Sequence, residues 1–147
     1  LETLAPARLQ ADRFLPSTPL RIMVNHKKES LTLDLPKLEK EAPYKLLDNP
    51  QINREILPGM LKAAKSFALE HAQAIIADSS KTMTQQLQTE IDRLTSLRKV
   101  NDHVRPEEIE LARKQFVRLT SALAQSRVRL DAVRLIWKGS PESIGGA

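Results

Sequence analysis

Two short segments near the start of the chain alternate between apolar and other side chains. The apolar residues recur at every second position: Leu20, Ile22 and Val24 in the first segment, and Leu31, Leu33 and Leu35 in the second. A period of two is typical of a β-strand, whose successive side chains point to opposite faces. Because the polar stretch NHKKES separates the segments and Pro36 follows them, the pattern predicts an antiparallel β-hairpin.

A different period begins near Pro58 and continues to Lys99. Apolar residues now recur at steps of three and four, which places them on one stripe of a helix. Pro58 suits the first turn of a helix, where its missing N–H is not needed, and neither proline nor glycine occurs between Gly59 and Lys99. The pattern therefore predicts one long helix. Its stripe contains Leu61, Ala64, Ala68, Ala72, Ile75, Ile76, Met83, Leu87, Ile91, Leu94 and Leu97.

A second helix is predicted to begin at Pro106, after a turn of a few residues. Its apolar steps alternate between three and four, the pattern of a coiled-coil seam. The seam positions are Ile109, Ala112, Phe116, Leu119, Leu123, Ser126, Leu130 and Val133. Helices joined by so short a turn must fold back antiparallel. The sequence thus predicts a helical hairpin over residues 58–132, with Leu87 near Leu119 and Met83 near Leu123.

The last apolar segment, RLIWK, has the alternation of a strand. Val133, Leu135 and Trp137 occupy alternate positions, and isoleucine, valine and tryptophan favour a pleated, half-buried surface. We expect residues 133–138 to form a strand that joins the early hairpin, although a helix continuing to Lys138 is the alternative. The predicted fold class is α+β: a long antiparallel helical hairpin, a coiled-coil-like arm, packed at its base on a small antiparallel sheet.

The chain has 147 residues, about the size of one domain. It lacks an initial methionine, so we expect it to be a fragment of a larger protein, and no apolar run approaches the roughly 20 residues of a membrane span. The absence of cysteine fits a reducing compartment. The predicted single domain, 1–147, comprises an irregular start with the β-hairpin (1–36), a connector (37–57), the arm (58–132), a closing strand (133–138) and a flexible tail (139–147).

The motifs of several enzyme classes are missing from the sequence. Four glycines cannot build a phosphate-binding loop or a dinucleotide fingerprint, and the three histidines are widely spaced. No serine has the G-x-S-x-G context of an activated nucleophile. Glu107 and Glu108 are explained by their place at a positively polarised helix start. We therefore predict that this fragment is not an enzyme and has no catalytic, cofactor-binding or metal-binding residues.

The positive charge of the chain lies in its last third. The net charge is +5, and residues 1–92 balance 12 basic against 12 acidic side chains, so residues 93–147 carry the whole excess. The candidate contacts to an anionic partner are Arg113, Lys114, Arg118, Arg127 and Arg129. They indicate either phosphate binding or an ordinary solvated or protein-contacting helix face. The lack of aromatic stacking residues around them argues against single-strand or base-specific recognition.

Three motifs together resemble one protein family. They are RFLPSTP at Arg13–Pro19, LTSLRKVN at Leu94–Asn101 and RLDAVRLI at Arg129–Ile136. Over residues 5–24 and 49–137 the chain is similar to the C-terminal region of the RapA (HepA) family of RNA polymerase-associated proteins. These proteins are bacterial ATPases of the SWI/SNF helicase-like superfamily.

The resemblance implies a parent protein in the bacterial cytoplasm that uses ATP and Mg²⁺ to remodel RNA polymerase complexes on nucleic acid. The ATPase motifs of the family lie upstream, and none maps onto a residue of this chain. The implied role is a non-catalytic accessory domain that contacts the parent's ATPase domains and offers a surface to the RNA polymerase core, DNA or RNA. Two alternatives stay open: a free-standing helical-hairpin adaptor for proteins, and a basic module that binds nucleic acid non-specifically.

Overall fold

The computed structural model describes residues 1–32 and 47–137 of the chain. Their contacts define two compact units. The first unit combines Leu1–Leu20 with Leu69–Arg129, and the second combines Arg21–Ala68 with the segment that starts at Leu130. The long helix α2, Leu57–Val100, contributes residues to both units. The α+β fold class predicted from the sequence is confirmed, and the single-domain organisation stays a prediction.

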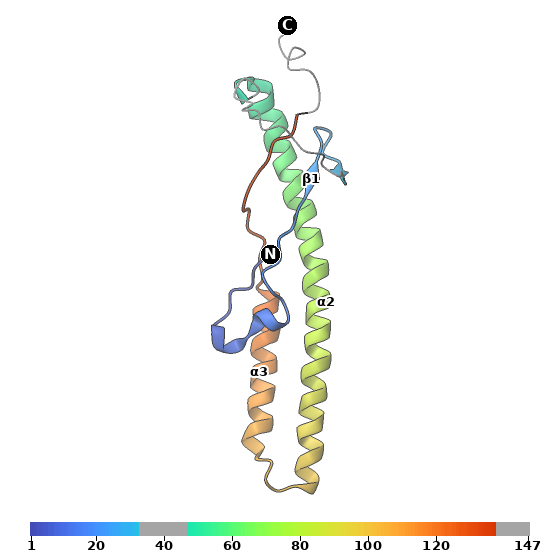
Figure 1. Ribbon diagram of the computed structural model, residues 1–147, viewed down its shortest axis with the longest axis vertical. Coiled ribbons are helices and arrows are strands. Elements are labelled where there is room, and N and C mark those ends of the chain that lie inside the picture. Colours follow the sequence, from blue (N-terminus) through green and yellow to red (C-terminus); the bar gives the residue numbers. More distant parts are fainter. Residues whose placement is uncertain (33–46, 138–147) are drawn as a thin grey trace. The chain divides into compact units, whose positions relative to one another are not determined.

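The first unit is built on an antiparallel helical hairpin, as predicted. Helix α3, Pro106–Ala124, lies alongside the C-terminal part of α2 (Figure 1). Asn101 organises the turn between them: its N–H donates to the Leu97 carbonyl at 2.9 Å, and its side-chain oxygen accepts from the His103 N–H at 3.0 Å. Pro106 then occupies the first turn of α3, where a missing N–H costs no helical hydrogen bond.

The core of this unit follows the predicted seam up to Leu123. Met83, Leu119 and Leu123 are fully buried and belong to one apolar cluster, on which Leu87 and Phe116 also pack. All four residues of the predicted pairs Met83–Leu123 and Leu87–Leu119 belong to this cluster or pack on it, and the pairing itself stays a prediction. Steps of three and four residues place these side chains on the facing sides of the two helices.

The N-terminal segment completes this core, although its sequence shows no regular period. It forms two short 3₁₀ turns, η1 (Ala7–Leu9) and η2 (Ala11–Arg13), which pack beside α3 (Figure 1). Leu1, Ala11 and Leu15 are buried in the cluster that contains Met83, together with Ala72 of α2. The part of α2 that α3 does not reach is thus partly covered by the chain's first twenty residues.

Helix α3 ends at Ala124, eight residues before the predicted limit at residue 132. Leu130 and Val133 were expected in the seam, but they are 71% and 52% exposed. The helix stops because the next residues pair with the start of the chain instead. Arg127 forms an antiparallel bridge with Glu2, and Val128 turns onto the apolar cluster.

The second unit contains the predicted β-hairpin, with shorter strands than expected. Strand β1, Met23–Val24, pairs antiparallel with β2, Ser30–Leu31. The register sets Met23 opposite Leu31, so these two residues share a face and Val24 lies opposite Ser30. Residues 33–35 of the predicted second strand lie outside the described residues.

The hairpin turn is held by one pair of polar residues. The Asn25 N–H donates to the Glu29 carbonyl at 3.0 Å, and the Glu29 N–H donates to the Asn25 side-chain oxygen at 2.9 Å. Lys28 adopts the left-handed conformation with φ of 68°, which is unusual for a residue with a side chain. The Lys28 side chain lies beside Gly59 of α2. A Cβ atom at that glycine would be only 3.0 Å from the Lys28 Cε atom.

The predicted closing strand at residues 133–138 is wrong in the described part of that segment. Residues 133–137 form neither a strand nor a helix, and the sheet found within residues 1–32 and 47–137 has two strands. Strand propensity alone does not make a strand without a partner edge, and here β1 and β2 pair with each other. The early and late parts of the chain do meet, but at Glu2 and Arg127.

The predicted connector, 37–57, is helical in its last part. A π-helix, Ile52–Ile56, leads directly into α2, so the helical path begins before Pro58. Residues 37–46 of the connector and the predicted tail at 139–147 lie outside the described residues.

Candidate interaction surface on helix α3

Helix α3 has two opposite faces of different chemistry. Ile109, Leu119 and Leu123 are buried, and their spacing fixes which side of the helix meets α2. At about 3.6 residues per turn, positions off this seam are exposed, whereas Phe116 on the seam packs on the core. Six exposed residues occupy positions off the seam and form what we name the outward face of α3: Glu110, Leu111, Arg113, Lys114, Val117 and Arg118.

Three of the five predicted basic residues come together on this face. Arg113, Lys114 and Arg118 line one shallow surface depression, with Glu110 and Val117 completing its walls. All three project from a single regular helix, so their spacing is fixed by the backbone. The structure brings these three residues together on one helix, and their contact with an anionic partner stays a prediction.

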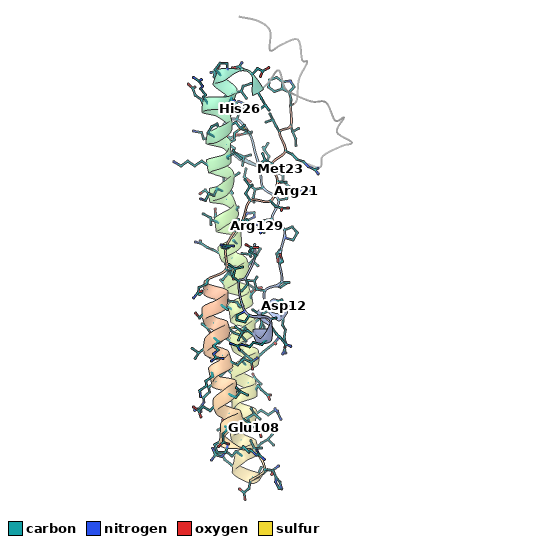
Figure 2. The ribbon with its side chains drawn as sticks, turned by 90° about the vertical axis from the view of Figure 1, so that its left-hand side faces the viewer. Asp12, Arg21, Met23, His26, Glu108 and Arg129 are labelled. Carbon is teal, nitrogen blue, oxygen red and sulfur yellow. The ribbon has the colours of Figure 1, made fainter. Side chains whose placement is uncertain are left out.

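The other two predicted residues, Arg127 and Arg129, lie beyond the end of α3, and Figure 2 labels Arg129 there. Arg127 exchanges two backbone hydrogen bonds of 2.9 Å with Glu2, and its Nε lies 3.1 Å from the Glu2 Oε1 atom. The Arg129 Nη1 atom lies 3.7 Å from Glu2 Oε2. Because both guanidinium groups share this carboxylate, we assign them to closure of the first unit rather than to the outward face.

The charges on the outward face are only partly neutralised. Lys114 Nζ lies 3.1 Å from Glu110 Oε1, one helical turn away, and both side chains are more than 60% exposed. Such an exposed pair contributes little to stability. Arg113 and Arg118 take part in no ion pair within the described part of the chain. The face therefore keeps two cationic groups available to an anionic partner.

Two apolar residues of this face were missed by the sequence prediction. Leu111 is 67% exposed and Val117 is 65% exposed, well above what a core position would show. Both lie off the seam spacing of Ile109, Leu119 and Leu123. A signal in the sequence could have identified them. Both are apolar residues at heptad positions that normally face solvent, and arginine and lysine lie between them.

A second, polar hollow lies on the first unit. Its lining comes from η2, α2 and α3: Arg13, Gln85, Gln86, Leu87, Thr89, Glu90 and Gln115. The Arg93 guanidinium group, hydrogen-bonded to Glu90 at 2.8 and 2.6 Å, lowers the pKa of that carboxyl group below its ordinary value. Glu90 therefore stays ionised near neutral pH and is unsuited to act as a general acid there.

Within residues 1–32 and 47–137, no group of three or more histidine, cysteine, aspartate or glutamate residues is placed to hold a metal ion. In the same part of the chain, no helix combines the length and the apolar character that crossing a membrane would require.

Nearly the whole chain matches the model of one protein family. Residues 1–138 match the model described as RNA polymerase recycling family C-terminal, which covers both helices and the outward face. The chain belongs to the RNA polymerase recycling family. The resemblance drawn from the three motifs is thereby confirmed, and the outward face lies within the region that this family shares.

Several relatives in the RNA polymerase recycling family carry the name RNA polymerase-associated protein RapA. The chain is 31% identical to the one from Vibrio parahaemolyticus over 141 residues, which is 90% of this chain and 14% of the relative. It is 32% identical to the one from Actinobacillus succinogenes, over 92% of this chain and 15% of the relative. The chain thus spans about one seventh of the length of these relatives.

Proposed function

We propose that this chain is a non-catalytic accessory domain of an ATP-dependent RNA polymerase recycling factor, and that α3 offers a contact surface to the RNA polymerase core. The family match supports the link to RNA polymerase, because its description and the names of the relatives refer to that enzyme. The parent's ATPase domains, with ATP and Mg²⁺, and its place in the bacterial cytoplasm are parts of the same proposal.

The observation that carries the contact role is the outward face of α3. The helical hairpin buries one side of α3 and leaves the other side with two exposed apolar residues beside cationic groups. Arginine is enriched in protein interfaces relative to the rest of the surface, so an arginine-rich face with exposed apolar side chains has the composition of a contact surface. A regular helix supported by a packed core is also a rigid platform for recognition.

Deletion of this region from the whole protein tests the proposal. We expect ATP hydrolysis in the absence of RNA polymerase to continue at a comparable rate, because the accessory domain supplies no reacting group. We expect affinity for the RNA polymerase core, measured by biolayer interferometry, to fall about tenfold or more, the size of effect that loss of one good contact produces. Unchanged affinity after deletion would contradict the contact role, and loss of all ATP hydrolysis would contradict the accessory role.

Non-specific nucleic-acid binding is the second candidate function, favoured by the exposed Arg113 and Arg118. Phosphate contacts release counterions, so affinity for a DNA duplex should fall steeply with salt. Replacing both arginines with alanine should weaken that binding and reduce the salt slope. Weak binding that does not depend on salt would exclude this function.

A further inference from the structure

We propose that the outward face of α3 binds an acidic, amphipathic helix of a protein partner. This inference rests on the proposed function and adds the chemistry of the partner. The face presents two kinds of contact at once: the guanidinium groups of Arg113 and Arg118, and the aliphatic side chains of Val117 and Leu111. A ligand that is only anionic, or only apolar, would contact one kind of side chain and leave the other kind exposed to water.

The charge of the face selects an anionic partner. Lys114 is already paired with Glu110, whereas Arg113 and Arg118 have no carboxylate partner within the described residues. A guanidinium group binds a carboxylate through two parallel N–H···O bonds, and this geometry adds specificity as well as attraction. Two carboxylates on the partner, one for each arginine, would satisfy both groups.

The apolar residues select a protein over a nucleic acid. Val117 lies beside Arg113 and Arg118 in the same depression, and it is 65% exposed. A phosphate backbone gains nothing from an aliphatic side chain, whereas a leucine or valine on a protein partner would remove apolar surface from water on both sides. The described outward face also has no aromatic side chain on which a base could stack.

The placement of the two arginines suits a helical partner. Arg113 and Arg118 are five residues apart on a regular helix, so their positions differ by about 7–8 Å along the axis and by about 140° around it. They therefore flank the depression that contains Val117 from two sides, and acidic residues on the two sides of an apolar stripe on a partner helix would each meet one arginine. An apolar residue on the same face of the partner, between its two acidic residues, would then meet Val117.

A defined peptide tests the proposal with the whole protein. The probe is a fluorescein-labelled synthetic helix of about 20 residues, long enough to be helical in water, with leucine at steps of three and four and glutamate flanking that stripe. Binding is measured by fluorescence anisotropy. We expect R113A/R118A to weaken peptide binding about tenfold or more, and L111S/V117S to weaken it about threefold or more.

The matched control removes the same charge elsewhere on the first unit. Lys81 and Arg98 are exposed residues of α2, so K81A/R98A changes the net charge equally without touching the outward face. We expect this variant to bind the peptide like the unaltered protein. Circular dichroism confirms that all variants keep their helix content, as expected for changes at exposed positions.

Three outcomes would overturn the inference. The first is an equal loss of peptide binding in the control variant. Peptide affinity would then depend on the net charge of the protein and not on the outward face. The second is that the protein binds a DNA duplex, that R113A/R118A abolishes this binding, and that L111S/V117S changes neither peptide nor DNA binding. The arginines would then serve a nucleic acid, and the apolar residues would have no role in binding. The third is self-association in sedimentation equilibrium that disappears in both α3 variants, which would make a second copy of the chain the occupant.

Failure of the proposed function is distinguishable from failure of this inference. If deletion of the region weakens RNA polymerase binding but the acidic peptide is not bound, the proposed contact role stands and the partner chemistry is wrong. If the peptide binds as expected and deletion leaves RNA polymerase binding unchanged, the proposed function is wrong and the face serves another acidic protein.

Discussion

Glu2 and Arg127 face each other as an antiparallel backbone pair, although they lie 125 positions apart in the chain. Their N–H groups and carbonyls exchange two hydrogen bonds of 2.9 Å, and the guanidinium Nε lies 3.1 Å from the carboxylate. The pair fixes the end of α3, because the chain leaves the helix just before Arg127. The backbone part of this pairing does not depend on the side-chain charge.

We predict that E2Q lowers the free energy of unfolding by less than about 1 kcal/mol, since the Arg127 side chain is 59% exposed and an exposed ion pair is weak. Urea unfolding followed by circular dichroism measures the effect. A double-mutant cycle with R127A should give a coupling energy of similar size. A coupling energy above about 2 kcal/mol would mean that the Glu2–Arg127 ion pair is far less accessible to water than the exposure of its side chains indicates.

The apolar seam between α2 and α3 predicts a larger loss of stability at Leu123. This side chain is fully buried beside Met83, so L123A should lower the free energy of unfolding by about 2–5 kcal/mol. The matched control is L111A on the same helix, where the leucine is 67% exposed and the change should stay within about 0.5 kcal/mol. Similar effects in the two variants would contradict the orientation of α3.

The hairpin turn predicts a stabilising substitution. Lys28 has φ of 68°, a conformation that costs an L-residue roughly 1–2 kcal/mol and costs glycine little. We therefore expect K28G to increase the protection of the Asn25 amide, whose N–H bonds to the Glu29 carbonyl, against hydrogen exchange. The neighbouring K27G changes a residue without positive φ and should decrease that protection. The opposite order would show that the position of the Lys28 side chain beside Gly59 stabilises the turn more than its positive φ costs.

Glu90 makes a prediction about pH. Its pKa is lowered chiefly by the hydrogen bond from Arg93, and R93Q should return the pKa towards its ordinary value. A carboxyl group with a depressed folded-state pKa contributes stability above its unfolded pKa, and that contribution is lost as pH falls through the folded value. An NMR titration of the Glu90 carboxyl chemical shift across the acidic pH range gives its pKa in the unaltered protein and in R93Q. Coincident titration curves would exclude a persistent Glu90–Arg93 pair.

The sequence predicted the parts of the fold that local spacing encodes. The seam from Ile109 to Leu123 and the hairpin between Met23 and Leu31 follow from periods that neighbouring residues define. The end of α3 could not be predicted this way, because Ser126, Leu130 and Val133 continue the same heptad spacing. Only the distant partner of Arg127, at Glu2, shows why the helix stops earlier.

The same limit applies to the candidate surface. Charge counting identified five basic residues, but it could not separate Arg113, Lys114 and Arg118 on α3 from Arg127 and Arg129 beside Glu2. Leu111 and Val117 were not recognised, because an apolar residue on a helix resembles a core residue until the orientation of the helix is known. Likewise, the first twenty residues show no period, yet they contribute Leu1, Ala11 and Leu15 to the core.

The joining of the first and last parts of one compact unit has a consequence for the order of folding. Residues 1–20 leave the ribosome long before residues 106–129, which form their partners in the core. Contacts of such large sequence separation form slowly, because a long loop must close before they become favourable. During synthesis Leu1, Ala11 and Leu15 therefore remain without their final neighbours until α3 has emerged, and chaperones would find these residues accessible for that interval.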